Sequence, residues 1–323
     1  MDFEPTEDQV ALRDATRAFC EGRFPMAVVR AHEEDGGRLD RRWWRELGDT
    51  GVFSLRLPEA DGGANLGVAD AVLVFEELGR ALVPGPVVAT HLAAELVPGA
   101  ASGERIVGLT DSRAEPQLVE HPDSIDTLLI LGDEGIRQLD PSAVELAAVA
   151  RPLDPLTPVA LAPAGLPAAE RVADRGSAAR WQLLGAVLTG GYLIGMASRT
   201  VELATAYAQE RQQFGRPIGS FQAVKHLIAD MLVKAEVARA AVHAAAVTWD
   251  QPEVGDVGRA ASAAKLLAGE AARFCAKTCI QVHGGMGFTW EVDAQRYWKR
   301  ACVLETHFGG ADEHAQLVAA SIE

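Results

Sequence analysis

The carboxyl-terminal half of the chain contains a long segment without proline, AARWQLLGAVLTGGYLIGMASRTVELATAYAQERQ (residues 178–212). The segment is rich in Ala, Leu and Val, with polar residues recurring at helical intervals. The segments 219–250 and 255–283 have the same pattern. At about 1.5 Å per residue, each segment predicts a helix roughly 40–50 Å long. Together with a terminal helical piece at about 294–321, they predict an antiparallel four-helix bundle over 177–323.

The stretch before the bundle has a different pattern. Between 103 and 176, short apolar runs such as 125–131 and 144–149 are separated by Asp, Gly and Pro, which is typical of strands of about five residues. Residues 1–102 have helical periodicity instead. We therefore predict a mainly α fold with an N-terminal helical domain (1–102), a reduced β domain (103–176) and a C-terminal helical bundle.

Several local signals define the N-terminal helices. Thr6 followed by Gln9 predicts a capping box, and Asp40 predicts the start of a second helix. A third helix is expected over Val68–Leu82, and a short fourth one is expected to end at about Leu96.

Composition excludes several classes of function. The 323 residues include 30 Lys and Arg against 45 Asp and Glu, so a formal charge of −15 argues against binding to nucleic acid. The four cysteines form no CxxC pair, and we expect no metal site. The longest apolar run, Leu183–Ala197, is shorter than the ~20 residues needed to span a bilayer. The acidic start lacks the pattern of a signal peptide, so we expect a cytoplasmic protein without a membrane partner.

Five motifs resemble the acyl-CoA dehydrogenase family. The first half contains MDFEPTEDQVALRDATRAF, LPEADGGANLG and LVFEELGRAL, and the second half contains RQQFGRPIGSFQ (211–222) and QVHGGMGFT (281–289). The last two resemble the family's RxxFGxPIxxFQ and QxxGGxGF segments. The resemblance is strong over about 177–300, good over 2–98 and poor over 103–175. It implies an acyl-CoA dehydrogenase-like fold and FAD as the cofactor.

The resemblance implies that the second-half motifs hold the ADP half of a neighbouring subunit's FAD. The residues concerned are Arg211, Phe214, Gln222, Gln281, Val282, His283, Gly284 and Gly285. The chemistry is suitable, because a pyrophosphate dianion pairs with an Arg fork and with backbone amides at a glycine turn. The alternative interpretation is a polar loop with an ordinary glycine helix cap.

The family's catalytic base has no counterpart in this sequence. In most relatives a Glu follows an Arg by nine residues, and counting from Arg300 places Gly309 there. In other relatives the base lies six residues before a Gly pair, which corresponds here to Leu184. The pair that grips the CoA moiety falls on Trp181 and Leu184, and the middle-domain flavin loop and Trp strand are missing. We therefore expect no catalytic residue.

Three residues near Gly309 are alternative bases, namely Glu305, His307 and Asp312. A shift in register could bring one of them into a pocket, and His307 is the kind of group that titrates near neutrality. The simpler interpretation, which we favour, is that they are solvent-facing residues on the turn before the last helix.

The combined pattern resembles the smaller subunit of heteromeric acyl-CoA dehydrogenases, as in actinobacterial sterol side-chain degradation. This resemblance implies a larger paralogue as partner, in an α2β2 heterotetramer, with the catalytic Glu and the acyl-CoA in the partner's pocket. Two alternatives remain at this stage: a homomeric flavoenzyme with a displaced base, or a non-catalytic scaffold.

Overall fold

The computed structural model describes residues 5–322, so the first four residues of the N-terminal motif and residue 323 lie outside it. Two compact units are formed, and each combines stretches that are distant in sequence. The helical unit contains the chain up to Met26, Val72–Val83 and the chain from Ala186 onward. The mixed unit contains Ala27–Ala71 and Pro84–Gly185.

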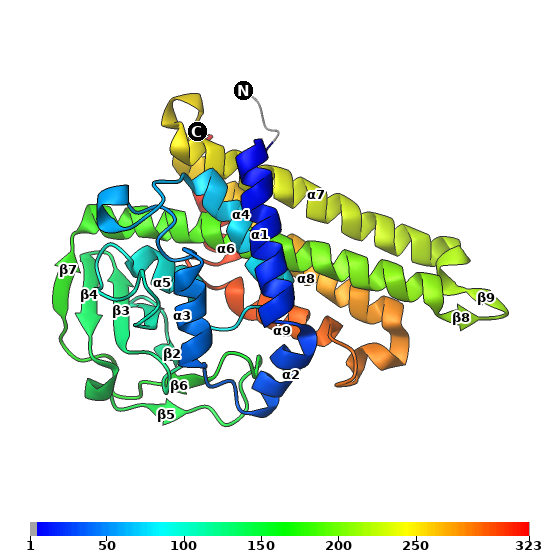
Figure 1. Ribbon diagram of the computed structural model, residues 1–323, viewed down its shortest axis with the longest axis horizontal. Helices are drawn as coiled ribbons and strands as arrows, with labels where there is room; N and C mark the ends of the chain where they lie inside the picture. Colours follow the sequence, from blue (N-terminus) through cyan, green and yellow to red (C-terminus); the bar gives the residue numbers. More distant parts are fainter. Residues whose placement is uncertain (1–4, 323) are drawn as a thin grey trace. The chain divides into compact units, whose positions relative to one another are not determined.

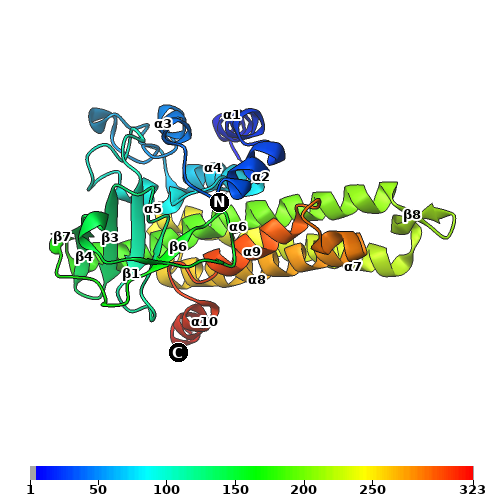
Figure 2. The ribbon, with the colours of Figure 1, turned by 90° about the horizontal axis from the view of Figure 1, so that it is seen from below.

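The helical unit is built mainly from the long helices predicted from the sequence (Figures 1 and 2). Its helices are α1 (Glu7–Arg23), most of α4 (Val68–Arg80), most of α6 (Arg175–Glu210), α7 (Gln222–Asp250), α8 (Val257–His283), α9 (Ala294–Leu304) and α10 (Ala311–Ala320). The capping box of Thr6 and Gln9 is confirmed at the start of α1. The terminal piece expected at 294–321 is two helices, because a turn with two positive φ angles, at Phe308 and Gly309, interrupts it.

Glycines allow α4 and α6 to approach closely. A Cβ added at Gly195 would lie 1.9 Å from the Glu76 carbonyl oxygen, and one at Gly79 would lie 1.9 Å from the Tyr192 carbonyl oxygen. Only residues without a side chain fit at such a crossing. The glycines inside the apolar segment 178–212 therefore serve helix packing.

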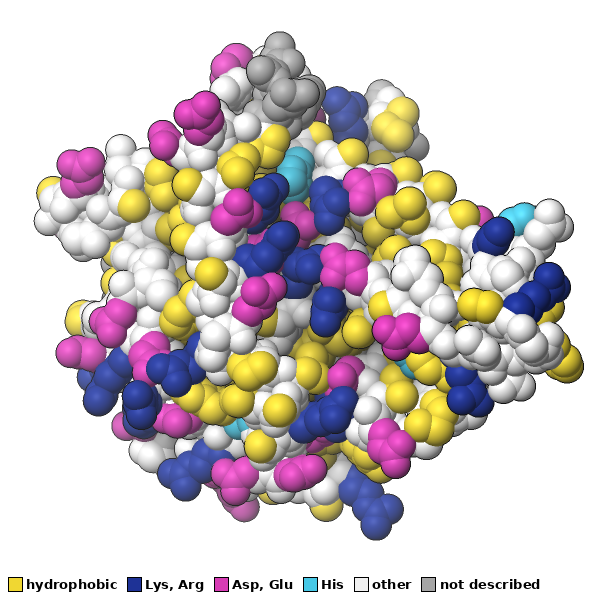
Figure 3. All heavy atoms as spheres, turned by 45° about the vertical axis from the view of Figure 1, so that its right-hand side comes forward, with side chains coloured by type: hydrophobic (Ala, Val, Ile, Leu, Met, Phe, Trp, Pro, Cys, Tyr) yellow, Lys and Arg dark blue, Asp and Glu magenta, His cyan; other side chains and the backbone are white. Residues whose placement is uncertain are grey.

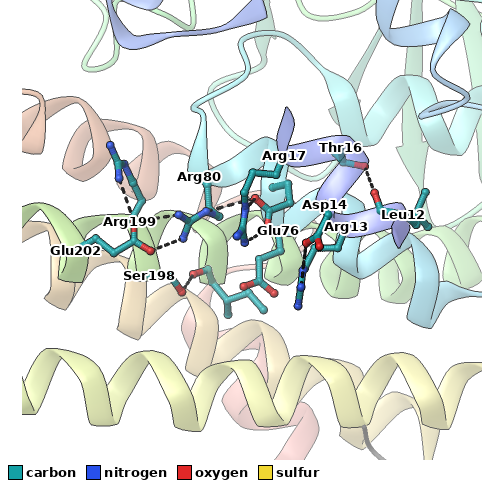
Figure 4. Close-up of polar contacts among 12 residues, drawn as sticks. Leu12, Arg13, Asp14, Thr16, Arg17, Glu76, Arg80, Ser198, Arg199 and Glu202 are labelled. Carbon is teal, nitrogen blue, oxygen red and sulfur yellow. Dashed lines mark hydrogen bonds and ion pairs between the residues drawn. The ribbon is translucent and has the colours of Figure 1, made fainter. Parts of the chain in front are cut away.

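A network of ion pairs joins the helices of this unit (Figure 4). Glu77, which is buried, accepts two hydrogen bonds from Arg17 of α1, at 2.7 and 3.0 Å. Arg80 pairs with Glu202 of α6 at 2.8 Å. The neighbouring Glu76 accepts two bonds from Arg239 of α7, at 2.7 and 3.0 Å, and its other oxygen lies 3.4 Å from His243 Nε2. Burial raises the pKa of this carboxylate, but the contacts with His243 and Arg239 outweigh it and keep the pKa below its usual range. Paired, hydrogen-bonded charges are the form in which a helical core tolerates ions.

The mixed unit contains the strands expected between 103 and 176. Its helices are α2 (Met26–Glu34, from Ala27), α3 (Arg41–Asp49) and α5 (Val87–Ala93), and its strands are β1 (Val107–Asp111), β2 (Leu118–Glu120), β3 (Thr127–Gly132), β4 (Gly135–Leu139), β5 (Ala147–Ala148), β6 (Val159–Leu161) and β7 (Glu170–Ala173). One sheet has the order β1-β3-β4-β7 and the other β2-β6-β5, and only β1 and β3 run parallel. The run at 144–149, expected as a strand, forms one only at Ala147–Ala148, and the Val149 N–H adds a hydrogen bond to the Val159 carbonyl at 3.0 Å. Asp40 caps α3 as predicted, since its carboxylate accepts from the Arg42 N–H at 2.7 Å.

None of the helices within residues 5–322 has the length and apolar character required to cross a membrane.

Candidate functional site

The motif at 211–222 forms a hairpin at the end of α6. Strands β8 (Gln212–Gln213) and β9 (Arg216–Pro217) pair across a two-residue turn of Phe214 and Gly215, whose φ angles are +54° and +75°. Two positive φ angles are what a tight hairpin turn of this hand requires, and glycine adopts them at little cost. A phenylalanine is strained in this backbone conformation. A role other than packing in the core is therefore needed to explain why it is there.

The side chains of this hairpin point into solvent. Phe214 is 92% exposed, and Arg211 and Gln222 are also exposed. The Phe214 and Phe221 rings meet in a T-shaped arrangement with centroids 6.1 Å apart, while the Arg216 guanidinium lies 4.1 Å from the centroid of the Phe221 ring. The hairpin thus presents a cationic and aromatic surface that residues 5–322 leave uncovered (Figure 3).

The second motif lies beside the base of this hairpin. The rings of Tyr207, one turn before Arg211 on α6, and His283, the last residue of α8, stack with centroids 4.1 Å apart. The His283 imidazole is fixed further by its Nδ1, which donates to the Cys279 carbonyl at 2.8 Å. This contact brings the two predicted binding segments together at one end of the bundle.

The glycine pair after α8 leaves its backbone open. Gly284 has φ +61°, and a Cβ added at Gly284 or Gly285 would meet nothing within 4 Å. Gln281 is exposed, whereas Val282 is buried, so Val282 can contribute to a ligand only through its backbone. The donor set at this end of the bundle is therefore a guanidinium, side-chain amides and open main chain.

The turn between α9 and α10 contains the position expected for a base. Gly309 is buried there with φ +102°, and a Cβ added to it would lie 2.8 Å from His314 Nε2. The two neighbours, Phe308 and Gly310, carry no proton acceptor either, so a shift of one residue in the alignment changes nothing. At the alternative position on α6, Leu184 is buried and equally inert.

The alternative bases near this turn differ in their surroundings. Glu305 is not a solvent-facing group as expected: its side chain is only 18% exposed and pairs with Arg273 Nε at 2.9 Å. Asp312 is exposed in the first turn of α10, and His307 is partly exposed. Glu305 is thus engaged in an ion pair with Arg273, whereas Asp312 and His307 lie nearer the surface.

Sequence reasoning missed two buried groups at this turn, Lys265 and His314, which are 2% and 1% exposed. One signal for Lys265 was available. It lies on the same face of α8 as Ala261, Ala268 and Ala272, at spacings of three to seven residues, and all three alanines are buried. A lysine on such an apolar stripe predicts a buried amine.

A small cavity lies within the mixed unit. It has a volume of about 250 Å³ and a buried floor that includes Phe53, Leu92, Trp181 and Leu184. Also buried in its wall, His91 donates from Nδ1 to the Val52 carbonyl at 2.8 Å, and burial lowers the pKa of the imidazole to about 4. Ligand pockets usually measure about 300–1,000 Å³. The cavity is below that range, and the positions expected for a CoA-gripping pair contribute only apolar wall.

Comparison with known protein families agrees with this architecture. The model of the acyl-CoA dehydrogenase C-terminal domain matches residues 179–322, and that of the N-terminal domain matches residues 6–104. The chain belongs to the acyl-CoA dehydrogenase family. The members of this family are FAD-dependent oxidoreductases, and the strong resemblance of the two halves and the poor one of 103–175 are reflected in the segments that the two models match.

Three relatives are informative. The acyl-CoA dehydrogenase IpdE2 of Mycolicibacterium smegmatis is 34% identical over 92% of this chain and 93% of its own length. The acyl-CoA dehydrogenase FadE34 of Mycobacterium tuberculosis is 33% identical over 98% of this chain, which spans only 48% of FadE34. Among solved structures, a variant of the Tcur3481-Tcur3483 steroid acyl-CoA dehydrogenase superposes with a TM-score of 0.82, at 25% identity and 98% coverage of both chains.

Proposed function

We propose that this acyl-CoA dehydrogenase family member is the smaller subunit of a heteromeric, FAD-dependent enzyme that introduces a double bond into an acyl-CoA thioester. It supplies residues for the ADP half of an FAD that a larger paralogue holds, and that paralogue carries the catalytic Glu. The observation that supports this best is the contrast between the exposed donors at 211–222 and the closed turn at Gly309.

The residues at the bundle end fit the ADP half of FAD. The Arg211 guanidinium offers a planar fork to the pyrophosphate, and Gln222 and Gln281 offer amide groups. A Cβ at Gly284 or Gly285 would meet nothing within 4 Å, so a phosphate oxygen can approach the main chain there. The Gly284 N–H already donates to the Gln281 carbonyl, so we assign the contact to the backbone beyond it, at Gly285. Phe214 offers an apolar face that excludes water from one side of the ligand. When bound, FAD accepts the hydride that leaves the substrate; this chain's residues bind and orient the tail.

At the two positions where relatives place the base, this chain offers no proton acceptor for the other half of the reaction. Removal of a proton beside a thioester carbonyl needs a carboxylate whose pKa is raised by burial, within reach of that proton. Gly309 and Leu184 occupy the two positions where relatives place it, and an added side chain at Gly309 would collide with His314. The base therefore has to come from another chain.

Two further observations support a partner of the same family. FadE34 has about twice the length that this chain spans, so in that relative the matching half is joined to as much sequence again. On this chain, α7 has an outward apolar face where Leu232, Val233 and Val237 are 50%, 61% and 51% exposed. Such a face suits another helical bundle, and we propose that it contributes to an α2β2 heterotetramer in the cytoplasm.

The Tcur3481-Tcur3483 relative suggests the class of substrate. That enzyme is a steroid acyl-CoA dehydrogenase, so we propose an acyl-CoA derived from a steroid, held by the partner chain. The small volume of the cavity within the mixed unit, about 250 Å³, is consistent with a substrate bound elsewhere.

Flavin stoichiometry tests the proposal. The chain is purified alone and after co-expression with a longer acyl-CoA dehydrogenase from the same genome that retains the Glu, and FAD is quantified against protein. We expect little flavin in the isolated chain and about one FAD per two chains in the complex, because each flavin needs residues from both. A stoichiometric flavin in the isolated chain, reduced on mixing with an acyl-CoA, would instead establish a homomeric enzyme with a displaced base.

A further inference from the structure

Lys265 is a buried amine that ties α8 to the α9–α10 turn. Its Nζ donates to the Glu305 carbonyl at 2.8 Å and to the Gly309 carbonyl at 3.2 Å. These two carbonyls lie at the two ends of the turn, and the lysine side chain is 2% exposed. One side chain thus fixes both ends of the segment that separates the last two helices.

The number of acceptors matches a neutral amine better than an ammonium ion. An ammonium group has three N–H donors and a neutral amine has two. Within the described residues, two carbonyl oxygens accept from Nζ, which leaves the third N–H of an ammonium buried without an acceptor. A buried donor without a partner costs free energy, and more so when it is charged.

The turn that Lys265 holds is strained. Phe308 and Gly309 have φ angles of +55° and +102°, a combination that persists only where surrounding groups impose it. His314 is the second such group, because its Nε2 donates to the Phe308 carbonyl at 2.9 Å. With Lys265 released, little within the turn itself favours the closed conformation.

We propose that Lys265 positions the α9–α10 turn as a neutral amine, and that its protonation allows the turn and α10 to open. Lys265 is a positioning residue in this role and contacts no substrate. The proposal is independent of flavin and of any partner subunit.

The charges around Lys265 come from all three helices that meet here. Burial lowers the pKa of Lys265 to about 8, while Glu305, directly after α9, and Glu313 of α10 act in the opposite direction. Glu305 is shared with Arg273 of α8, and the pKa of His314 is itself lowered by burial and by Lys265. In the closed turn, Lys265 therefore changes between its charged and neutral forms at about pH 8.

The direction of the pH effect follows from linkage. Once the turn opens, Lys265 reaches water and regains its ordinary pKa of 10.5. Opening therefore takes up a proton between about pH 8 and pH 10.5, and the closed turn becomes more favourable as the pH rises through that window. Below about pH 8 both states are protonated, so further acidification changes nothing.

Hydrogen exchange of the full-length chain tests this inference. Protection factors for amides 305–312 are measured at pH 7 and pH 9.5 and corrected for the intrinsic exchange rate. We expect protection to rise roughly 25-fold between the two values, which is the change that the two pKa values give by linkage. Unchanged or falling protection would overturn the proposal, and this measurement needs no variant.

Three variants identify the group. Lys265→Met cannot titrate, so its protection should not depend on pH; Lys265→Arg stays charged, so it should keep low protection at both pH values. Lys234→Met is the matched control, because Lys234 lies on the partly exposed face of α7 and pairs with Glu270 at 2.6 Å. The Lys234→Met control should show the full rise in hydrogen-exchange protection between pH 7 and pH 9.5. A pH-dependent rise of wild-type size in Lys265→Met would contradict the assignment.

Discussion

Two turns of the helical unit each have a Phe-Gly pair with positive φ angles, and they have opposite surroundings. Phe214-Gly215 in the β8–β9 hairpin and Phe308-Gly309 between α9 and α10 both have two successive positive φ angles. Phe214 is 92% exposed, however, and Phe308 only 9%. A Cβ added at Gly215 meets nothing within 4 Å, whereas one at Gly309 lies 2.8 Å from His314 Nε2.

The comparison separates a turn that is open to solvent from one that is closed by its neighbours. The hairpin directs cationic and aromatic groups outward, as a surface that binds a ligand or partner must. The α9–α10 turn is filled by Lys265, His314 and its own backbone, so the position where relatives place the base is closed as well as vacant of a carboxylate. If the proposed function holds, the packing around Gly309 has changed together with the residue itself, so restoring a carboxylate by one substitution should not restore a base.

The largest expected effect is the cost of a methyl group at Gly309. Gly309→Ala should destabilise the chain by about 3 kcal/mol in urea unfolding, because backbone strain at φ +102° adds to overpacking against the buried His314. Gly215→Ala, with φ +75° and open space, is the matched control and should cost about 1 kcal/mol. Equal costs at the two positions would show that the α9–α10 turn has room for a side chain.

The second-largest expected effect is on the affinity for FAD, while the stability of the fold should stay unchanged. In the flavin-loaded complex, Arg211→Ala should weaken FAD retention by about 2 kcal/mol, roughly 30-fold, because a charged hydrogen bond to the pyrophosphate is lost. The isolated chain should unfold as before, since Arg211 is exposed. The measurement is an equilibrium titration of the apo-complex with FAD, followed by flavin fluorescence.

Two variants show whether FAD binding depends on the planar fork of the Arg211 guanidinium or only on its positive charge. Arg211→Lys keeps the charge without the planar fork, so its affinity should be intermediate. Arg216→Ala is the control from the same hairpin, because that guanidinium is already engaged over Phe221, and its FAD affinity should change less than about threefold. If Arg211→Ala bound FAD like the wild type, the assignment of the hairpin to the ADP half would fail.

The features that local sequence determines were predictable from it. The capping box at Thr6, the cap at Asp40 and the three long helices follow from side chains within one or two turns of each other. The outward position of Arg211 could also be anticipated, since a polar hairpin between two long helices has no core to enter.

The features missed by the sequence depend on residues far apart in the chain. The break between α9 and α10 is held by Lys265, 40 residues before Glu305, and the buried Glu76 finds its partner Arg239 163 residues later. Glu305 was expected to face solvent because nothing nearby in sequence indicates Arg273. The two compact units likewise combine segments from both ends of the chain, which periodicity cannot show.

The smallest expected effect separates stability from binding at the hairpin. Phe214 has an unfavourable φ of +54° and is 92% exposed, so it contributes strain to the fold with little packing in return. Phe214→Gly should therefore stabilise the isolated chain by about 0.5 kcal/mol, as relief of the strain slightly exceeds the backbone entropy that glycine adds to the unfolded state. The same variant should bind FAD or the partner more weakly, because the proposed complex would bury the exposed ring. Urea unfolding of the chain and FAD titration of the complex should thus change in opposite directions. Destabilisation of the isolated chain would mean that Phe214 packs within its own subunit, and the contrast with Phe308 would then be one of degree only.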